Sequence, residues 1–501
     1  MLFEKKAVSG ILFTFLLVSM FVLASNIQSV KASGTICIRA DGSIDPPTAP
    51  ISTLDNVTYT LTGNITSDTD GIVVEGDNIV VDGAGHCIQG TGIGINLEGR
   101  SNVTIRNTNI KNSGYGIWLE GSSNNSIVGN KITNNSYGID LYMWAQNNSI
   151  VGNSMTDNQL GIWLEWWSNY NSIVGNVFVN DGLAAWDFYG NVVIDNLVNG
   201  KPLVYLENVS DVEVEDAGQV LLVNCTRIRV ENLNLSNTAA GVQVWRTSHS
   251  TIAGNNITNN RRDGIRLRDS SNNSIVGNNI IGNSADGIRL HGSSDHNSIT
   301  GNIMTSNGEG ITLEDSTNNN ISQNNITACT GYYFAIKLAY SSNNSIFENS
   351  IANNGWGIGL DDASNNSFCH NNFINNTVEV YDWESGARYA NLWDNGCEGN
   401  FWSDYNGVDL DNDGVGDTYL PWEGVDDYPL MNVYWNPCDI NHDLKVDMRD
   451  IGISAKAFGT VPGDTFWNPH ADITGPELLV PDGKVDMRDI SLVARHFGRH
   501  F

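Results

Sequence analysis

Apolar residues recur along most of this chain at a nearly constant spacing, inside a phrase whose clearest copies read SNNSIVGN. The apolar residue of one copy is followed by that of the next after 22 to 25 residues in most cases. A Gly-Ile pair keeps step with this phrase. A fixed period of this size is the sequence signature of a solenoid. The aligned apolar residues are Ile105, Ile127, Ile150, Ile173, Ile252, Ile275, Ile299, Ile321, Ile346 and Phe368, and the Gly-Ile pairs begin at Gly94, Gly116, Gly138, Gly161, Gly264, Gly287, Gly310 and Gly357.

Each period is predicted to contain short strands and no helix. The segments Ser-Ile-Val, x-Ile-x and Gly-Ile-x-Leu alternate apolar and polar residues, which is the two-residue rhythm of a half-buried strand. Asn, Gly and Ser fill the joints between these segments, where left-handed backbone angles are easiest to adopt. One coil cannot bury its isoleucines alone, but stacked coils form a continuous apolar column. The predicted fold is mainly β: a right-handed parallel β-helix solenoid of roughly a dozen coils, about 55–60 Å long. The joint asparagines are expected to form hydrogen-bonded ladders between coils.

The pattern divides the chain into four parts. Residues 1–32 read as an export signal, because Lys5 and Lys6 precede an apolar run and Val30-Lys31-Ala32 offers a cleavage site. Residues 33–78 form a lead-in or cap, 79–432 form the β-helix, and 436–501 form a separate module. Within the β-helix, residues 177–248 lose the repeated phrase but still alternate, which predicts irregular coils. The expected location is secreted or at the cell surface, with membrane attachment only if the signal segment stays uncleaved.

Charge narrows the possible partners. The chain has 56 acidic and 26 basic residues and a formal net charge of −30. This balance disfavours nucleic acid as a partner, since phosphate binding needs a basic surface. Seven cysteines suit an exported chain. Cys37 with Cys87, or Cys369 with Cys397, are candidate disulfides whose connectivity the spacing does not decide.

An acidic loop near the end of the β-helix is a candidate cation site. It reads D-x-D-x-D-G-x-G-D, with Gly414 available for the turn. Alternate carboxylates in a turning loop provide hard oxygen ligands of the kind that Ca²⁺ prefers. An acidic surface loop is the alternative. The four carboxylates are Asp409, Asp411, Asp413 and Asp417.

The C-terminal module contains a duplication: KVDMRDIGISAKAFG (445–459) recurs as KVDMRDISLVARHFG (484–498), with 10 of 15 positions identical. Each copy follows an acidic loop with the spacing of a calcium loop that leads into a helix. In the second loop an insertion lies after Asp472, and Thr474 or Glu477 is the candidate for its third position. The predicted ligands are Asp439, Asn441, Asp443, Lys445 (through its carbonyl), Asp447 and Asp450 in the first loop, and Asp472, Asp482, Lys484, Asp486 and Asp489 in the second.

Two family resemblances follow from these motifs. The repeats, the segment GKPLVYLENVSD…AGQVLLVNCT and the exit GNFWSDYNGVDLDNDGVGDTYLPWEGVDDYPL resemble the NosD-like periplasmic β-helix proteins, within a wider group of carbohydrate-binding and sugar-hydrolase β-helices. This resemblance implies the fold strongly and an activity only weakly, because one fold hosts many functions. The paired loop–helix units resemble a dockerin, a small α-helical, EF-hand-like domain. That resemblance implies Ca²⁺ as cofactor and a cohesin-type domain as partner.

The Gly-Ile-x-Leu-x strand is expected to aim its two x positions outward and to stack them in columns between coils. Early coils mix aromatic residues with carboxylates, and middle coils are basic. Aromatic rings beside carboxylates suit sugar binding, because rings stack on the apolar faces of sugars and acids accept hydroxyl protons. Ordinary cross-coil packing is the alternative. The predicted ligand-binding residues are Trp118, Asp140, Tyr142, Trp163 and Glu165, followed by Arg266, Arg268, Arg289 and His291.

Three classes of function remain open at this point. One is a non-catalytic protein that binds polysaccharide and docks through its C-terminal module. Another is a polysaccharide hydrolase or lyase, for which Glu98 and Glu120 on neighbouring coils are weak catalytic candidates. The last is a structural envelope rod or, from the family name, a periplasmic copper-accessory protein, although the histidines lack ligand spacing. A more specific hypothesis is that the protein binds an anionic polysaccharide, whose acid groups pair with Arg266 and Arg289. Its alternative is that the arginines only offset Asp263, Asp269 and Asp286.

Overall fold

Short parallel strands make up most of the computed structural model, which describes residues 34–186, 189–329, 331, 333–383, 386–434, 438–441, 446–474 and 482–497. The predicted signal segment therefore lies outside the described residues. The coils form a parallel β-helix of about 15 turns. They belong to two compact units, the first containing the described residues up to Phe178 and Ala184–Val193, and the second containing Val179–Leu183 and the residues from Ile194 onward. The irregular coils that begin at residue 177 coincide with this division.

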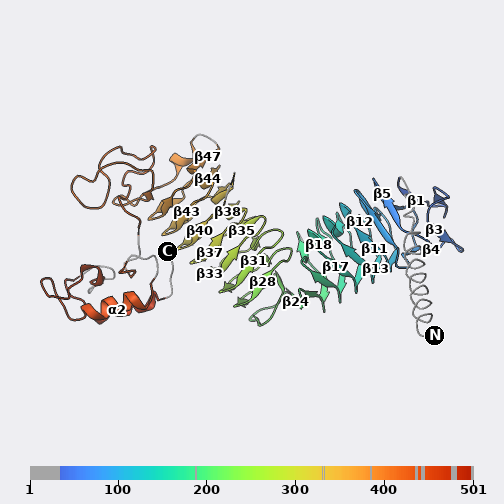
Figure 1. The fold of residues 1–501 in the computed structure, drawn as a ribbon, viewed down its shortest axis with the longest axis horizontal. Helices are drawn as coiled ribbons and strands as arrows, with labels where there is room; N and C mark the ends of the chain where they lie inside the picture. The colour runs from blue at the N-terminus through green and yellow to red at the C-terminus, as the bar shows by residue number, and fades with distance from the viewer. Residues whose placement is uncertain are drawn as a thin grey trace, which may run out of the picture. The chain divides into compact units, whose positions relative to one another are not determined.

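Three sheets form the first unit, and within it the strands of successive coils lie side by side (Figure 1). The sheet that carries the Gly-Ile pairs, called here the Gly-Ile sheet, has the order β2 (Ile44–Asp45), β1 (Ile36–Ile38), β6 (Ile72–Val74), β9 (Ile93–Asn96), β12 (Tyr115–Glu120), β15 (Tyr137–Tyr142), β18 (Leu160–Leu164) and β21 (Leu183–Ala185). The Ser-Ile sheet has the order β3 (Ile51–Thr53), β4 (Thr58–Leu61), β7 (Val80–Asp82), β10 (Thr104–Arg106), β13 (Ser126–Val128), β16 (Ser149–Val151), β19 (Ser172–Val174) and β22 (Val192–Ile194). The third sheet contains β5 (Ile65–Ser67), β8 (Cys87–Gly90), β11 (Asn109–Lys111), β14 (Lys131–Thr133), β17 (Ser154–Thr156) and β20 (Val177–Val179).

The second unit repeats this arrangement. Its Gly-Ile sheet contains β23 (Leu197–Val198), β24 (Lys201–Glu207), β26 (Gln219–Val223), β29 (Val242–Trp245), β32 (Ile265–Arg268), β35 (Asp286–His291), β38 (Glu309–Glu314), β41 (Phe334–Ala339), β44 (Trp356–Asp361) and β47 (Val378–Asp382). Its Ser-Ile sheet contains β25 (Glu213–Val214), β27 (Arg229–Glu231), β30 (Thr251–Ala253), β33 (Ser274–Val276), β36 (Ser298–Thr300), β39 (Asn320–Ser322), β42 (Ser345–Phe347) and β45 (Ser367–Cys369). Its third sheet contains β28 (Asn234–Ser236), β31 (Asn256–Thr258), β34 (Asn279–Ile281), β37 (Ile303–Thr305), β40 (Asn325–Thr327), β43 (Ser350–Ala352), β46 (Asn372–Ile374) and β48 (Phe401–Trp402).

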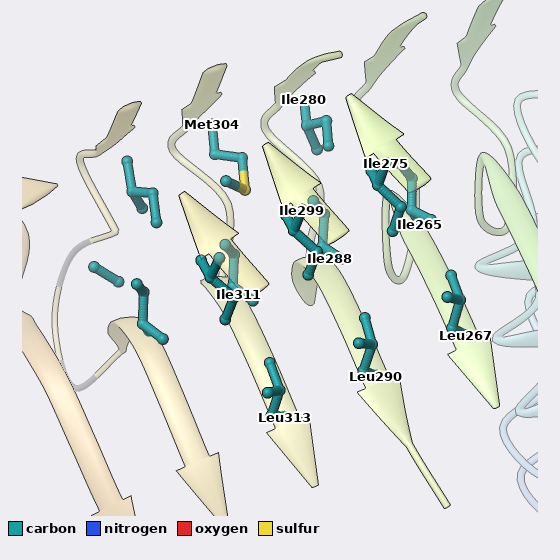
Figure 2. Packing of buried hydrophobic residues seen from close by; sticks show 14 of the residues in the cluster. Ile265, Leu267, Ile275, Ile280, Ile288, Leu290, Ile299, Met304, Ile311 and Leu313 are labelled. Atoms are coloured by element: carbon teal, nitrogen blue, oxygen red, sulfur yellow. The ribbon is translucent and has the colours of Figure 1, made fainter. Parts of the chain in front are cut away.

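The register predicted from the repeat is confirmed in both units. Ile105, Ile127, Ile150 and Ile173 pair along one sheet, and the row from Ile252 to Phe368 pairs along another. These side chains are at most 1% exposed. Figure 2 shows how the rows meet in the second unit: Ile265, Ile288 and Ile311 form one row, and Leu267, Leu290 and Leu313 form the next. Burial of this apolar column is the main favourable term for the fold.

The glycine of the Gly-Ile pair is required by close approach of neighbouring coils. A Cβ atom added at Gly264 would lie 2.7 Å from the carbonyl oxygen of Gly287 and 2.8 Å from Ile280 Cγ2. Both distances are shorter than carbon atoms tolerate without displacement of the backbone. The pair therefore marks the point where one coil touches the next, which explains its regular return.

Buried asparagines form the predicted ladders. One ladder in the second unit runs through Asn255, Asn278, Asn302, Asn324, Asn349, Asn371 and Asn400, with each Nδ2 donating to the next Oδ1 at 2.9–3.0 Å. The same Nδ2 groups also donate to main-chain carbonyls, as Asn278 does to Ile252 at 2.9 Å. The ladders thus satisfy polar groups at corners where the strand hydrogen bonds are interrupted.

The start of the first unit and the end of the second unit depart from the regular parallel coils in different ways. In the lead-in, β1 pairs with β2 and β3 pairs with β4 in antiparallel fashion. At the other end of the second unit, Trp422 stacks on Trp402 and Trp402 stacks on Phe373, with ring centroids 3.7 and 4.2 Å apart. None of the seven cysteines is in a disulfide in the described structure, so neither candidate disulfide is formed.

The C-terminal module contains two short α-helices, α2 (Met448–Ala457) and α3 (Met487–Arg495), which pack against each other. Two 3₁₀ turns, η1 (Ala387–Ala390) and η2 (Pro469–Ala471), complete the described elements. The small core of the module includes Cys438, Val446, Val485 and Val493, each fully buried. None of the helices in the described part of the chain has the length and apolarity needed to span a bilayer.

Candidate functional site

The outward side chains of the Gly-Ile sheet of the second unit fall into the predicted columns. Ile288 and Leu290 point into the core, and side chains alternate along a strand. Arg289, which lies between them, and His291, which follows Leu290, therefore point outward. One column runs through Gln243, Arg266, Arg289, Thr312 and Lys337, and the next through Trp245, Arg268, His291 and Glu314. A third column, just before the Gly-Ile pair, contains Asp286 in register with Glu309.

Acidic and basic side chains of these columns form one connected group, called here the arginine face. Its basic members are Arg266, Arg268, Arg289 and Lys337, and its acidic members are Asp263, Asp286, Glu309 and Glu314. The shortest ion pair joins Arg289 to Glu314 at 2.6 Å. Longer pairs join Arg289 to Asp286 at 3.5 Å, Arg266 to Asp263 at 3.9 Å and Lys337 to Glu309 at 3.9 Å. Arg268 lies 3.7 Å from Asp269. The arginines therefore do pair with Asp263, Asp269 and Asp286, the acids predicted as their alternative partners.

Several of these groups are buried although they point outward. Asp263 is 3% exposed, Asp286 5%, His291 6% and Arg266 7%. Residues on neighbouring coils lie about 4.8 Å apart and cover one another. The expectation that both x positions face out in direction is confirmed, but the face is far less exposed than an ordinary sheet surface.

Burial perturbs the ionisation of this group. It lowers the pKa of Arg266 to about 10 despite the nearby Asp263. It raises the pKa of Asp286, with further contributions from the charges of Asp263 and Glu309. Burial, together with the three neighbouring arginines, lowers the pKa of His291 to about 2. His291 is therefore neutral, which agrees with the hydrogen bond that its Nε2 accepts from Arg266 Nε at 3.1 Å.

An aromatic cluster adjoins the arginine face on β41, β44 and the coil that follows. It consists of Phe334, Trp356, Tyr381 and Trp383. Trp356 and Tyr381 stack with centroids 4.5 Å apart, and Phe334 lies 4.5 Å from Trp356 and 5.0 Å from Trp383. Lys337 Nζ lies 5.4 Å from the centre of the Trp383 ring and so connects the two groups. This cluster was not predicted from the sequence. The signal available was the aromatic residue that replaces an acid before the Gly-Ile position in β41 and β44.

In the first unit the Gly-Ile sheet is aromatic rather than basic. Asn96, Trp118, Asp140 and Trp163 are in register, and Glu120 pairs with Tyr142. The rings are half-buried, while Asp140 is only 1% exposed. The rings pack against one another across coils, which is the alternative named from the sequence, while part of each ring stays open to solvent. The tryptophans that are well exposed are Trp144, Trp166 and Trp167, at the adjoining turns.

The paired register of β9 and β12 ends at Asn96 and Trp118, and the weak catalytic candidates Glu98 and Glu120 follow directly after it. The two coils stay hydrogen-bonded there, from the Gly99 N–H to the Glu120 carbonyl at 2.8 Å. A catalytic role for the two acids stays a prediction. Glu98 lies beyond the end of β9 and is exposed, and its backbone N–H donates to Asn96 Oδ1 at 2.9 Å. Glu120 is the last residue of β12. A shallow pocket of about 540 Å³ lies elsewhere on this unit and is lined in part by Gly85, Asn109 and Lys131. None of the predicted site residues lines it.

The acidic loop gathers three of its four carboxylates. Oxygen atoms of Asp409, Asp411 and Asp413 lie within 4.8 Å of one another. Proximity to Asp413 raises the pKa of Asp411. Asp409 accepts hydrogen bonds from the N–H groups of Asn412 and Gly414, and Gly414 has φ of +94°. The fourth carboxylate, Asp417, accepts from the N–H of Leu410.

The two loops of the C-terminal module have similar hydrogen bonds around their closing carboxylates, as the duplication predicts. Asp450 accepts hydrogen bonds from the N–H groups of Asn441 and Asp447, and Asp489 accepts from those of Ile473, Thr474 and Asp486. Asp439, Asp450 and Asp489 are fully buried, and Asp472 is 5% exposed. The loop-closing carboxylates and the first carboxylate of each loop thus lie inside the module. Asp482, Lys484 and Asp486 are less buried, with Asp482 and Asp486 both paired to Arg488, while Asp443 and Lys445 lie outside the described residues.

Solved structures similar to this chain include three polysaccharide-modifying proteins. The periplasmic alginate epimerase AlgG has 15% identity and a TM-score of 0.25, covering 70% of this chain and 82% of its own. The A-module of the Azotobacter vinelandii mannuronan C-5 epimerase AlgE6 has 12% identity and a TM-score of 0.31, covering 72% and 88%. A mannuronic acid specific polysaccharide family 6 lyase from human gut microbiota has 14% identity and a TM-score of 0.31, covering 74% and 81%.

Sequence comparisons define the family. A search of curated proteins found no match. The family model described as periplasmic copper-binding protein (NosD) matches residues 22–187 and 181–407, which is most of the chain and includes both Gly-Ile sheets. On this match the chain belongs to the NosD family.

Proposed function

We propose that this protein is an exported polysaccharide-binding protein, and that the arginine face and the adjoining aromatic cluster of the second unit hold a polysaccharide that carries acid groups. The periplasmic description of the family agrees with export. The observation that carries the proposal is the concentration of buried ionisable groups on an outward face directly beside stacked aromatic rings. Buried charges are costly to a fold, and strongly perturbed pKa values gather at functional sites.

The chemistry of the two groups suits the two parts of an acidic sugar. A guanidinium group binds a carboxylate through two parallel hydrogen bonds. Arg289 is the most exposed of the three arginines of the face, with 31% of its side chain exposed, and its buried Nε has no hydrogen-bond partner among the described residues. Trp383 is 42% exposed and offers a ring for the apolar side of a sugar. Lys337 lies between the charged and aromatic groups.

The competing interpretation is that the arginines only neutralise the acids with which they pair. Every arginine of the face has such a partner, so an incoming carboxylate must compete with Glu314 for Arg289. Polysaccharide cleavage at the same face is the second candidate function. The observation in its favour is that a neutral imidazole, His291, and a carboxyl group with raised pKa, Asp286, both lie close to Arg289.

Replacing Arg289 by Gln is expected to weaken binding of uronic-acid oligosaccharides by about 10- to 100-fold, because one charge-assisted contact is worth about 1.5–3 kcal/mol. Binding of neutral oligosaccharides should not change. The matched control is Arg229→Gln, since Arg229 also forms an ion pair, with Glu231, but lies on the Ser-Ile sheet. Isothermal titration of the full chain measures both affinities, and an assay for new unsaturated or reducing ends tests for cleavage.

If Arg229→Gln loses as much affinity for uronic-acid oligosaccharides as Arg289→Gln, only the net charge of the protein matters for binding. No loss with the Arg289 variant would support the interpretation in which the arginines offset nearby acids.

Copper, which the family description names, gains no support from the side chains that the structure describes. Copper sites favour nitrogen and sulfur ligands. The group of potential metal ligands found close together is Asp409, Asp411 and Asp413, and it contains neither histidine nor cysteine. His370 is engaged with Glu398 at 2.8 Å, and His291 accepts a hydrogen bond from Arg266.

For the C-terminal module we propose a calcium-dependent docking role with a cohesin-type partner. The support is the repeated placement of buried carboxylates at the start and end of each loop, with a helix beginning directly after Asp447 and Asp486. Carboxylates crowded into a loop repel one another unless a cation or N–H groups compensate them. The acidic loop at 409–417 has the same chemistry and is proposed as a further Ca²⁺ site.

Asp450→Ala and Asp489→Ala are each expected to remove one calcium-binding event from the full chain, because each deletes the closing carboxylate of one loop. Asp464→Ala is the control, since Asp464 is an exposed acid of the same module that caps a turn. Calorimetric titration with CaCl₂ measures the events. A wild-type titration without uptake would remove the calcium proposal, and so would variants that titrate like wild type.

A further inference from the structure

Asp140 in the first unit is a buried acid on the outward side of a sheet. Ile139 and Leu141, its neighbours in β15, are fully buried in the core, so the Asp140 side chain points to the opposite face. It is nevertheless only 1% exposed, and its Oδ1 has no hydrogen-bond partner among the described residues. Such a group costs free energy comparable to a lost hydrogen bond, and therefore calls for an explanation.

Aromatic side chains surround this carboxyl group. Trp118 and Trp163 are its register neighbours on the adjoining coils, and Tyr137 and Tyr142 lie on its own strand. Tyr137 stacks on Trp163 with centroids 4.9 Å apart and an angle of 17° between the rings, and Trp118 lies 5.3 Å from Tyr142. Tyr115 extends the stack, 4.9 Å from Tyr137. The rings themselves are half-buried, so part of each faces solvent.

The carboxyl group is kept neutral by these surroundings. Burial raises the pKa of Asp140 to about 8, and the charge of Glu165 adds to the effect. At neutral pH the group therefore both donates and accepts hydrogen bonds. The registered columns of this face contain Asn96, Trp118, Asp140, Trp163, Glu120 and Tyr142, and no basic residue.

We propose that this face of the first unit is a second saccharide site, which takes neutral sugar rings and hydrogen-bonds their hydroxyl groups to the buried carboxyl group of Asp140. Tryptophan and tyrosine faces pack against the C–H faces of a pyranose, and a few buried polar groups fix its orientation. The acids on the face disfavour uronic acids, and the absence of a basic residue from its registered columns leaves nothing there to pair with a carboxylate. The site is independent of the arginine face and has the opposite charge preference.

The test compares Asp140→Leu with Asp140→Asn in the full chain, using a neutral hexasaccharide of glucose or mannose and a hexasaccharide of uronic acids. Asp140→Leu is expected to lower affinity for the neutral sugar about tenfold or more, equivalent to one lost hydrogen bond. Asp140→Asn should stay within about threefold of wild type, because an amide also donates and accepts. Uronic-acid binding should not change in either variant.

The melting temperature distinguishes a binding role of the Asp140 carboxyl group from a structural one. Asp140→Leu should melt at or above the wild-type temperature, because it removes a buried polar atom that lacks a partner. A structural role for the carboxyl group predicts a lower melting temperature and no specific change in affinity. Trp118→Ala provides a second variant, and it should also lose affinity for the neutral sugar.

Two results would overturn the inference: no binding of neutral sugars by wild type, or neutral-sugar affinity that is unchanged in both Asp140→Leu and Trp118→Ala. Failure of the arginine-face proposal is distinguishable, because it concerns uronic acids and Arg289→Gln. That variant should keep its affinity for neutral sugars whatever it does to uronic acids.

Discussion

Replacing Ile275 by Asp is expected to destabilise the second unit by more than about 4 kcal/mol, which is among the largest effects seen for single substitutions. Ile275 is fully buried in β33 and pairs in register with Ile252 and Ile299 on the coils to either side. The substitution removes an apolar side chain from the column and puts an unpaired carboxylate in its place. Because each coil of a solenoid packs only on its neighbours, the disruption should spread to the adjoining coils.

Val276→Asp is the matched control for this prediction. Val276 is the next residue of the same strand, but it is 37% exposed and points away from the core. The same charge there should change the free energy of unfolding by less than about 1 kcal/mol. Circular dichroism melts of wild type and both variants provide the comparison. If Ile275→Asp melts like Val276→Asp, the proposed register of the β-helix is wrong.

Replacing Asn278 by Leu is expected to cost about 3–5 kcal/mol, because the side chain belongs to four hydrogen bonds in a buried ladder. Its Nδ2 donates to Ile252 O and Asn302 Oδ1, and its Oδ1 accepts from the backbone N–H and the Nδ2 of Asn255. A leucine of similar size fills the space but leaves these partners unsatisfied. The amide of Asn255 and the carbonyl of Ile252 cannot reach water to compensate.

The neighbouring residue, Asn279, separates this effect from a general requirement for asparagine. Asn279 is the first residue of β34, and its side chain donates to Asn256 Oδ1 at 2.9 Å outside the core. Asn279→Leu should therefore cost less than about 1 kcal/mol. Denaturant unfolding of the two variants measures the difference, and equal costs would mean that the buried ladder contributes little.

The repeat predicted the buried residues well, because burial in a solenoid depends mainly on a residue's position within its coil. Ile275 and Leu290 are buried wherever the period places them, since every coil meets the same two neighbours. The asparagine ladders follow for the same reason: identical amides at identical joints must meet. The fold class, the register and the outward columns were accordingly readable from spacing alone.

The burial of the outward face was not predictable in the same way. Whether Asp140 or Arg266 is covered depends on the size and rotamers of side chains one coil above and below, and the period says nothing about these. The aromatic cluster was missed because Trp356 occupies the position before the Gly-Ile pair, while Tyr381 lies in a coil that lacks the pair. The pairing of Arg289 with Glu314 joins different columns of adjoining coils. Within the C-terminal module, Asp443 and Lys445 stay predictions, because they lie outside the described residues.

Affinity electrophoresis of the full, unmodified chain shows directly whether these two faces bind polysaccharide. Native gels that contain a uronic-acid polysaccharide, a neutral polysaccharide or no polysaccharide are compared at the same pH and salt concentration. The wild-type chain should be retarded in both polysaccharide gels, and Arg289→Gln should lose only the retardation by the uronic-acid polymer. Identical mobility of the wild-type chain in all three gels would contradict polysaccharide binding by these faces.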